Sequence, residues 1–66
     1  MNDAMIQSKG LTILEDQMNH EFLACKKAEH YAGTFEDAQL ADLANQISAC
    51  HRQRYERLFN YLNSHA

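Results

Sequence analysis

The chain has 66 residues and a mass of 7.6 kDa, which is enough for one small domain. A chain this short buries only about 60% of its surface on folding, so a core formed by one chain alone is marginal. Six basic and nine acidic residues give a net charge of −3 with the two signs interspersed, which excludes the basic surface of a nucleic-acid-binding domain.

The composition predicts an all-α fold. Pro, Trp and Val are absent, and the five β-branched residues are too few to build strands. Hydrophobic residues make up 45% of the chain, which argues against disorder. No stretch approaches the roughly 20 apolar residues of a membrane span, and the N-terminal residues lack the pattern of a signal peptide. We therefore expect a cytoplasmic protein that does not bind membranes.

In chain order, residues 1–10 are expected to form a flexible N-terminal arm ahead of a single helical-hairpin domain over residues 11–66. The first helix is predicted over residues 11–32, where Thr12 and Glu15 have the spacing of a capping box, and Ser8 is a competing start one turn earlier.

A two-residue connection is predicted next. Gly33 suits the left-handed residue that follows a helix, and Thr34 suits the N-cap of a second helix, with Asp37 three residues later. The second helix is therefore predicted over residues 35–63 and antiparallel to the first. With a positive φ at Gly33, the substitution Gly33→Ala is expected to cost about 1 kcal/mol.

Both predicted helices carry an apolar stripe at helical spacing. The stripes comprise Leu11, Leu14, Met18, Phe22, Cys25, Ala28 and Ala32, and then Leu40, Leu43, Ala44, Ile47, Cys50, Tyr55, Leu58, Tyr61 and Leu62. Apolar residues beside the stripes have no place in a single hairpin: Ile13, Ala24, Tyr31 and Phe59. We therefore predict that two hairpins pair into a homodimeric four-helix bundle.

Four polar residues interrupt the apolar pattern near the middle of the hairpin: Glu15, Glu21, His51 and Arg54. A connection at Gly33 would place Glu21 level with Ile47 and Ser48. In one interpretation the four residues form a structural polar layer, in which Arg54 is bonded to Glu15 or Glu21 and His51 lies close by. Such a layer can set register and oligomeric state.

In the alternative interpretation, Glu21 and His51 are metal ligands. Two-fold pairing would bring two copies of each toward one axis, a four-ligand set suited to Zn, Fe or Mn. A di-iron centre is a third interpretation, but Ser48 stands where its Glu-x-x-His motif needs a glutamate. The positive charge of Arg54 favours the structural layer, and hence no cofactor.

The cysteines and the remaining polar residues show no catalytic motif. Cys25 and Cys50 are expected at different levels of the hairpin, too far apart for a disulfide, and as buried core residues. No nucleophile elbow, phosphate-binding loop or Cys–His pair in a defined context is present in the sequence. We therefore expect no enzymatic activity.

A spaced set of residues over positions 11–62 carries a family resemblance: Leu14, Glu21, Lys26-Lys27, Tyr31-Ala32, the segment Asp37-Ala38-Gln39-Leu40 with Leu43, then Ile47, His51 and Leu58. In this pattern the chain resembles the small ferritin-like helical hairpin proteins of the spore coat F type. The resemblance implies a ferritin-like half-bundle and an association with the spore coat.

These features predict a non-enzymatic structural protein that self-associates through its apolar helix faces, with a second copy of itself as the partner. Two alternatives remain open. One is a ferritin-like metal-binding module that uses Glu21 and His51 from two protomers. The other is an adaptor that offers its exposed apolar side chains to a helix of an unidentified protein.

Overall fold

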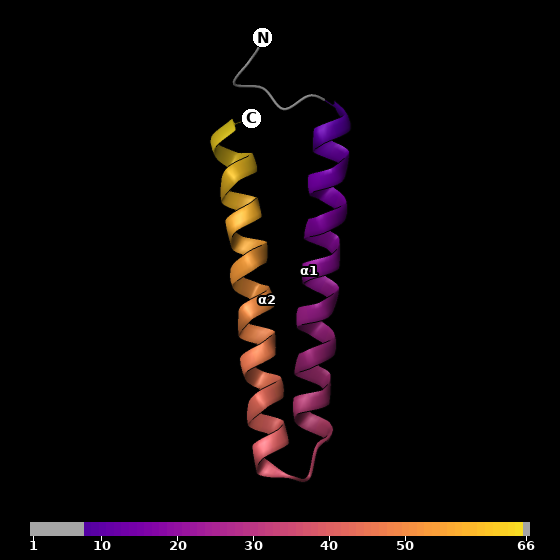
Figure 1. Ribbon diagram of the computed structural model, residues 1–66, viewed down its shortest axis with the longest axis vertical. Coiled ribbons are helices and arrows are strands. Elements are labelled where there is room, and N and C mark those ends of the chain that lie inside the picture. The colour runs from indigo at the N-terminus through magenta and orange to yellow at the C-terminus, as the bar shows by residue number, and fades with distance from the viewer. Residues whose placement is uncertain (1–7, 66) are drawn as a thin grey trace.

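The computed structural model describes residues 8–65 and consists of two helices side by side. Helix α1 (Ser8–Thr34) and helix α2 (Ala38–His65) run antiparallel and are joined by residues 35–37 (Figure 1). The molecule measures 53 × 16 × 10 Å, and its radius of gyration is 15.2 Å, whereas a compact domain of this length would have about 11 Å. The prediction of an all-α hairpin is confirmed, and its shape is that of an open two-helix layer.

Helix α1 is longer than predicted at both ends. It begins at Ser8, and the hydroxyl of Thr12 donates to the carbonyl of Ser8 at 3.0 Å. Thr12 therefore lies within the helix, and the predicted capping box with Glu15 is wrong. Of the predicted N-terminal arm, residues 8–10 are helical, and residues 1–7 lie outside the described part of the chain.

The connection lies later in the chain than the sequence predicted. No glycine in residues 8–65 has a positive φ, and Gly33 is part of α1, so its predicted left-handed conformation is wrong. The hydroxyl of Thr34 donates back to the carbonyl of His30 at 2.9 Å, and the backbone N–H of Phe35 donates to the carbonyl of Tyr31 at 3.0 Å. Helical bonding thus continues to the end of Thr34, which ends α1 and does not cap α2.

Asp37 is the N-cap of α2. Its carboxylate accepts hydrogen bonds from the backbone N–H groups of Gln39 at 2.8 Å and Leu40 at 3.2 Å, and its carbonyl accepts from Ala41 at 3.0 Å. An aspartate is a better N-cap than a threonine, and its negative charge lies at the positive end of the helix. The second helix therefore begins at Ala38.

The later connection changes which residues are level with one another. Glu21 contacts His51 and Cys25 contacts Ser48, whereas the predicted connection placed Glu21 level with Ile47 and Ser48. The actual partner of Glu21 lies three or four residues further along α2, which is about one helical turn. The same sides of the two helices therefore still face each other, with different pairs in contact.

The core between the helices is narrow. Its buried hydrophobic residues are Cys25, Ala28 and Ala44, and its buried polar residues are Glu21 and Ser48. All of these side chains except Glu21 are short, which lets the two helices approach closely but buries little apolar surface. Large hydrophobic residues remain exposed along both helices and in the connection: Leu11, Ile13, Phe22, Leu23, Tyr31, Phe35, Leu40, Leu43, Ile47, Phe59 and Tyr61.

Candidate functional site

A buried acid and a histidine meet halfway along the hairpin. Glu21 is the middle residue of α1, and His51 is one of the two middle residues of α2. Glu21 is 4% exposed, and its Oε1 lies 2.5 Å from Nδ1 of His51. Its other oxygen, Oε2, accepts a hydrogen bond at 3.0 Å from the side-chain amide of Gln17, one turn earlier on α1. Both carboxylate oxygens are therefore bonded.

These bonds favour the ionised carboxylate. The hydrogen bond from His51 holds the pKa of Glu21 below its ordinary value of 4.5, although burial acts in the opposite direction. The amide of Gln17 and the positive charge of Arg54 lower the pKa further. Because an ionised carboxylate can only accept hydrogen bonds, Nδ1 of His51 is protonated and donates a hydrogen bond to Oε1. The other ring nitrogen, Nε2, does not contact Glu21.

Arg54 and Glu15 do not join this pair in the way that the sequence predicted. Arg54 lines a hollow beside Glu21, and its positive charge lowers the pKa of Glu21. Its side chain is exposed, however, and among the described side chains it forms no ion pair with Glu15 or Glu21. Glu15 is exposed and lines a different hollow together with Met18, whereas Gln17 lines the hollow beside Glu21. The predicted Arg54–carboxylate bond is wrong, because His51 occupies the position opposite Glu21.

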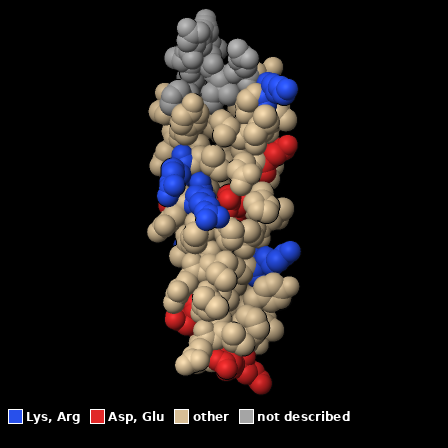
Figure 2. Space-filling view, in the orientation of Figure 1, with Lys and Arg blue, Asp and Glu red and all other residues tan. Residues whose placement is uncertain are grey.

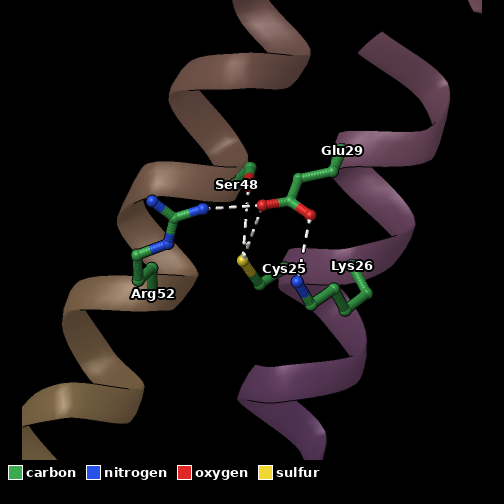
Figure 3. A network of polar contacts seen from close by, with 5 residues as sticks. All are labelled: Cys25, Lys26, Glu29, Ser48 and Arg52. Carbon is green, nitrogen blue, oxygen red and sulfur yellow. Dashed lines mark hydrogen bonds and ion pairs between the residues drawn. The ribbon is translucent and has the colours of Figure 1, made fainter. Parts of the chain in front are cut away.

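A second polar network crosses between the helices about one turn nearer the connection (Figure 3). The Sγ atom of Cys25 lies 3.3 Å from Oγ of Ser48, and both residues are buried. Glu29 accepts hydrogen bonds from Arg52 at 2.6 Å and from Lys26 at 3.4 Å. Its carboxylate also lies 3.9 Å from Sγ of Cys25, which links the two groups of contacts.

This network was not predicted from the sequence, although the spacing of its residues is a signal for it. Glu29 stands four residues after Cys25 and three after Lys26, so the three share one side of α1. Arg52 stands four residues after Ser48 on α2. Both cysteines were expected in the core. Cys25 is buried as expected, whereas Cys50 is exposed and the expectation for it is wrong.

One broad side of the hairpin, which we call the groove face, is hollowed along its length. A hollow of about 620 Å³ runs from the middle toward the connection, and a second of about 580 Å³ runs from the middle toward the other end. His51 lines the first and Glu21 the second, so the two hollows meet at this pair. Residues that line them recur every seven positions, namely Gln17, Ala24 and Tyr31 on α1 and Leu40, Ile47, Arg54 and Tyr61 on α2.

The other broad side, which we call the bridged face, carries side-chain contacts that cross between the helices. Two hollows on this side that are lined by described residues measure about 410 and 230 Å³. Phe22 and Tyr55 contact each other across the helices with ring centroids 6.0 Å apart, and Phe59 stacks on Tyr55 at 6.5 Å. The ion pair between Arg52 and Glu29 spans the same side. Side chains of this one chain therefore connect the two helices on this face, while Phe22 and Phe59 themselves stay exposed.

Within one chain, Glu21 and His51 supply two donors for a metal ion, and no group of three or more His, Cys, Asp or Glu in residues 8–65 is arranged to hold one. A zinc site has at least three protein ligands, so further donors would have to come from a second chain. Neither α1 nor α2 has a segment long and apolar enough to span a bilayer. No family model, curated protein or solved structure matches the chain.

Proposed function

We propose that the protein is a non-enzymatic structural protein whose hairpins self-associate into a homodimeric four-helix bundle. The exposure of its large hydrophobic side chains carries this proposal. Leu23 is 65% exposed and Ile13 is 59% exposed, while the buried hydrophobic residues within the hairpin are one cysteine and two alanines. Exposed apolar surface of this extent marks an interaction site, and a second copy is the simplest partner for a chain too short to build its own core.

The polar contacts support a structural role. The carboxylates of Glu21 and Glu29 are each bonded on both oxygens by groups of the same chain, across the two helices as well as along α1. Glu21 is buried, so leaving its carboxylate without partners would be costly, and its bond to His51 favours one alignment of the two helices. The contacts of Glu29 lie at the surface and add less to this alignment.

The proposal is tested by the mass of the protein in solution. Light scattering or sedimentation equilibrium at tens of micromolar is expected to give twice the chain mass of 7.6 kDa, with a helical circular dichroism spectrum. A helical chain that stays monomeric at these concentrations would contradict self-association.

A location in the spore coat is proposed on the resemblance alone. A fluorescent fusion that stays diffuse in sporulating cells would contradict it.

The placement of Glu21 and His51 at the helix midpoints favours a second candidate function, metal binding between two protomers. Two-fold pairing would bring two such pairs together, and Nε2 of each His51 is the ring nitrogen that does not contact Glu21. A metal site predicts one Zn²⁺, Fe²⁺ or Mn²⁺ per dimer by elemental analysis of untagged protein and a higher melting temperature with that ion. The structural proposal predicts no stoichiometric metal, and a melting temperature that His51→Gln lowers equally with and without added ion.

A further inference from the structure

We infer that Nε2 of His51 is a phosphoryl acceptor, and that Glu21 orients the ring and stabilises the positive charge that the ring gains on phosphorylation. The inference concerns a single chain, so it goes beyond the proposed self-association and does not depend on it. Three observations support it: the bond that fixes the ring, the space beside the ring, and the cationic residues around it.

The bond from Glu21 leaves one nitrogen of His51 available for chemistry. Oε1 of Glu21 lies 2.5 Å from Nδ1 and keeps the proton there, so in the neutral ring the lone pair is on Nε2. A carboxylate bonded to one ring nitrogen makes the other more basic and a better nucleophile. His20 and His30 are exposed, but neither contacts a carboxylate among the described side chains. Of these three histidines, His51 is therefore the one arranged for nucleophilic attack.

The ring of His51 lies beside open space. Its side chain is 21% exposed and lines the hollow of about 620 Å³, which meets the hollow of about 580 Å³ at Glu21. Three alanines line the same hollow as His51, namely Ala24, Ala28 and Ala44. Because these side chains are small, a donor molecule can approach the ring from solvent, and a phosphoryl group on the ring has room.

The charged residues around the pair favour an anionic group. Lys27, Arg54 and Arg57 line the two hollows, and Glu21 is the one acidic residue among the described residues that line them. The chain as a whole has a net charge of −3, so this excess of cations is local. In the space-filling view, basic side chains lie over the middle and far half of α2, away from the acidic ones near the connection (Figure 2). A phosphoryl group brings nearly two negative charges and three acceptor oxygens, which arginine and lysine bind well.

The transfer step balances with a donor of the phosphoramidate class. The lone pair of Nε2 attacks phosphorus and forms an N–P bond, while the bond from phosphorus to the protonated nitrogen of the donor breaks and ammonia leaves with its electron pair. The proton on Nδ1 stays in place, so the ring becomes a cation that carries the phosphoryl group. The carboxylate of Glu21, which is buried and already bonded to Nδ1, stabilises this cation without moving.

The acceptor is tested by treating the untagged full chain with potassium phosphoramidate at neutral pH, with EDTA present to keep metal ions off the ring. We expect peptide mapping without acid steps to find the phosphoryl group on His51, formed at least about tenfold faster than on His20 or His30. These two exposed histidines are controls within the same molecule, so the comparison needs no variant. Equal rates at the three sites, or a ³¹P NMR signal from phosphorylation at Nδ1, would overturn the inference.

The part played by Glu21 is tested by Glu21→Gln, which keeps the length of the side chain and removes its charge. We expect phosphorylation of His51 to slow by about tenfold or more in a chain that remains helical by circular dichroism. Nitrogen-15 NMR of the ring separates orientation from stability, because a loss of stability alone does not move the ring proton. We expect the proton on Nδ1 in the wild type and no fixed position in Glu21→Gln. A wild-type ring protonated on Nε2 would overturn the inference even if the variant does not fold.

The cations are tested by Arg54→Gln, with Arg52→Gln as the matched control. Both arginines are exposed on α2, but Arg54 lines the groove face, whereas Arg52 is paired with Glu29 on the bridged face. We expect Arg54→Gln to slow the reaction of His51 severalfold and Arg52→Gln to leave it within about twofold of the wild type. Equal effects would overturn the role of Arg54. Light scattering on the same samples keeps the proposals distinct, because a monomer phosphorylated at His51 supports this inference and contradicts self-association.

Discussion

The substitution Gly33→Ala distinguishes the observed structure from the sequence-based expectation, because the two predict opposite changes in the free energy of unfolding. Gly33 is the last residue but one of α1 and has no positive φ. A Cβ atom built at this position has nothing within 4 Å, so a methyl group would enter open space. Alanine therefore fits the native backbone without strain, and it removes conformational freedom from the unfolded chain.

The size of the effect follows from helix propensity. Alanine is about 0.8–1.0 kcal/mol more favourable than glycine in the interior of a helix, and part of this remains in a final turn. We expect Gly33→Ala to raise the free energy of unfolding by about 0.5–1 kcal/mol per chain. For a domain of this size, that corresponds to roughly 2–8 °C in melting temperature. Thermal and urea unfolding followed by circular dichroism at 222 nm, at one fixed chain concentration, measure it.

The matched control is Ala32→Gly, one residue earlier in the same turn of α1. It is expected to lower the free energy of unfolding by a similar amount, which shows that this turn is helical. If Gly33→Ala instead destabilises the protein by about 1 kcal/mol, Gly33 is in the left-handed conformation. In that case α1 ends before Gly33, and the one-turn change in pairing described above is incorrect.

Further predictions concern the cap, the buried acid and the small core. Asp37→Ala is expected to lower the free energy of unfolding by about 1 kcal/mol, whereas Thr34→Ala changes it by less than about 0.5 kcal/mol; equal effects in urea unfolding would contradict the assignment of the N-cap. Because the pKa of Glu21 is lowered in the folded protein, its contribution to stability is complete above pH 4.5 and is lost as the pH falls through the lower folded-state pKa; Glu21→Gln should flatten the loss of stability measured across this range. Ser48→Leu, at a residue 3% exposed between the helices, should cost about 1–3 kcal/mol by overpacking, and Ser48→Ala less than about 1 kcal/mol; a tolerated leucine would show that the helices are not in close contact there.

The sequence was sufficient to predict two antiparallel helices and which residues lie toward the middle of the hairpin. Cys25 and Ala28 belong to the apolar stripe predicted for the first helix and Ala44 to that of the second, and all three are buried. Periodicity is a property of many residues at once, so an error at one end of a helix does not change it. This is why the faces could be predicted although the boundaries could not.

The connection was mispredicted because two weak local signals competed with one strong one. Gly33 followed by Thr34 is typical of a helix end and a new start, yet alanine-rich and aromatic neighbours continue the helix through both. Asp37 then offers a carboxylate that accepts hydrogen bonds from two backbone N–H groups. That contribution outweighs the preference of a glycine for the position after a helix, which is a statistical tendency and no requirement.

The pairing across the helices depends on the exact position of this connection, and sequence alone could not supply it. A change of about one turn keeps the same sides of the two helices together but replaces the residues that are paired, so Glu21 contacts His51 and Arg54 is left exposed. The consequence is chemical as well as geometric. An arginine opposite Glu21 would have placed a permanent positive charge beside the carboxylate, whereas the histidine meets it with Nδ1 and keeps Nε2 as a second polar atom that does not contact Glu21. In the proposed dimer, two-fold pairing would bring two carboxylates and two such nitrogens together, and that four-donor set is what the metal-binding alternative requires.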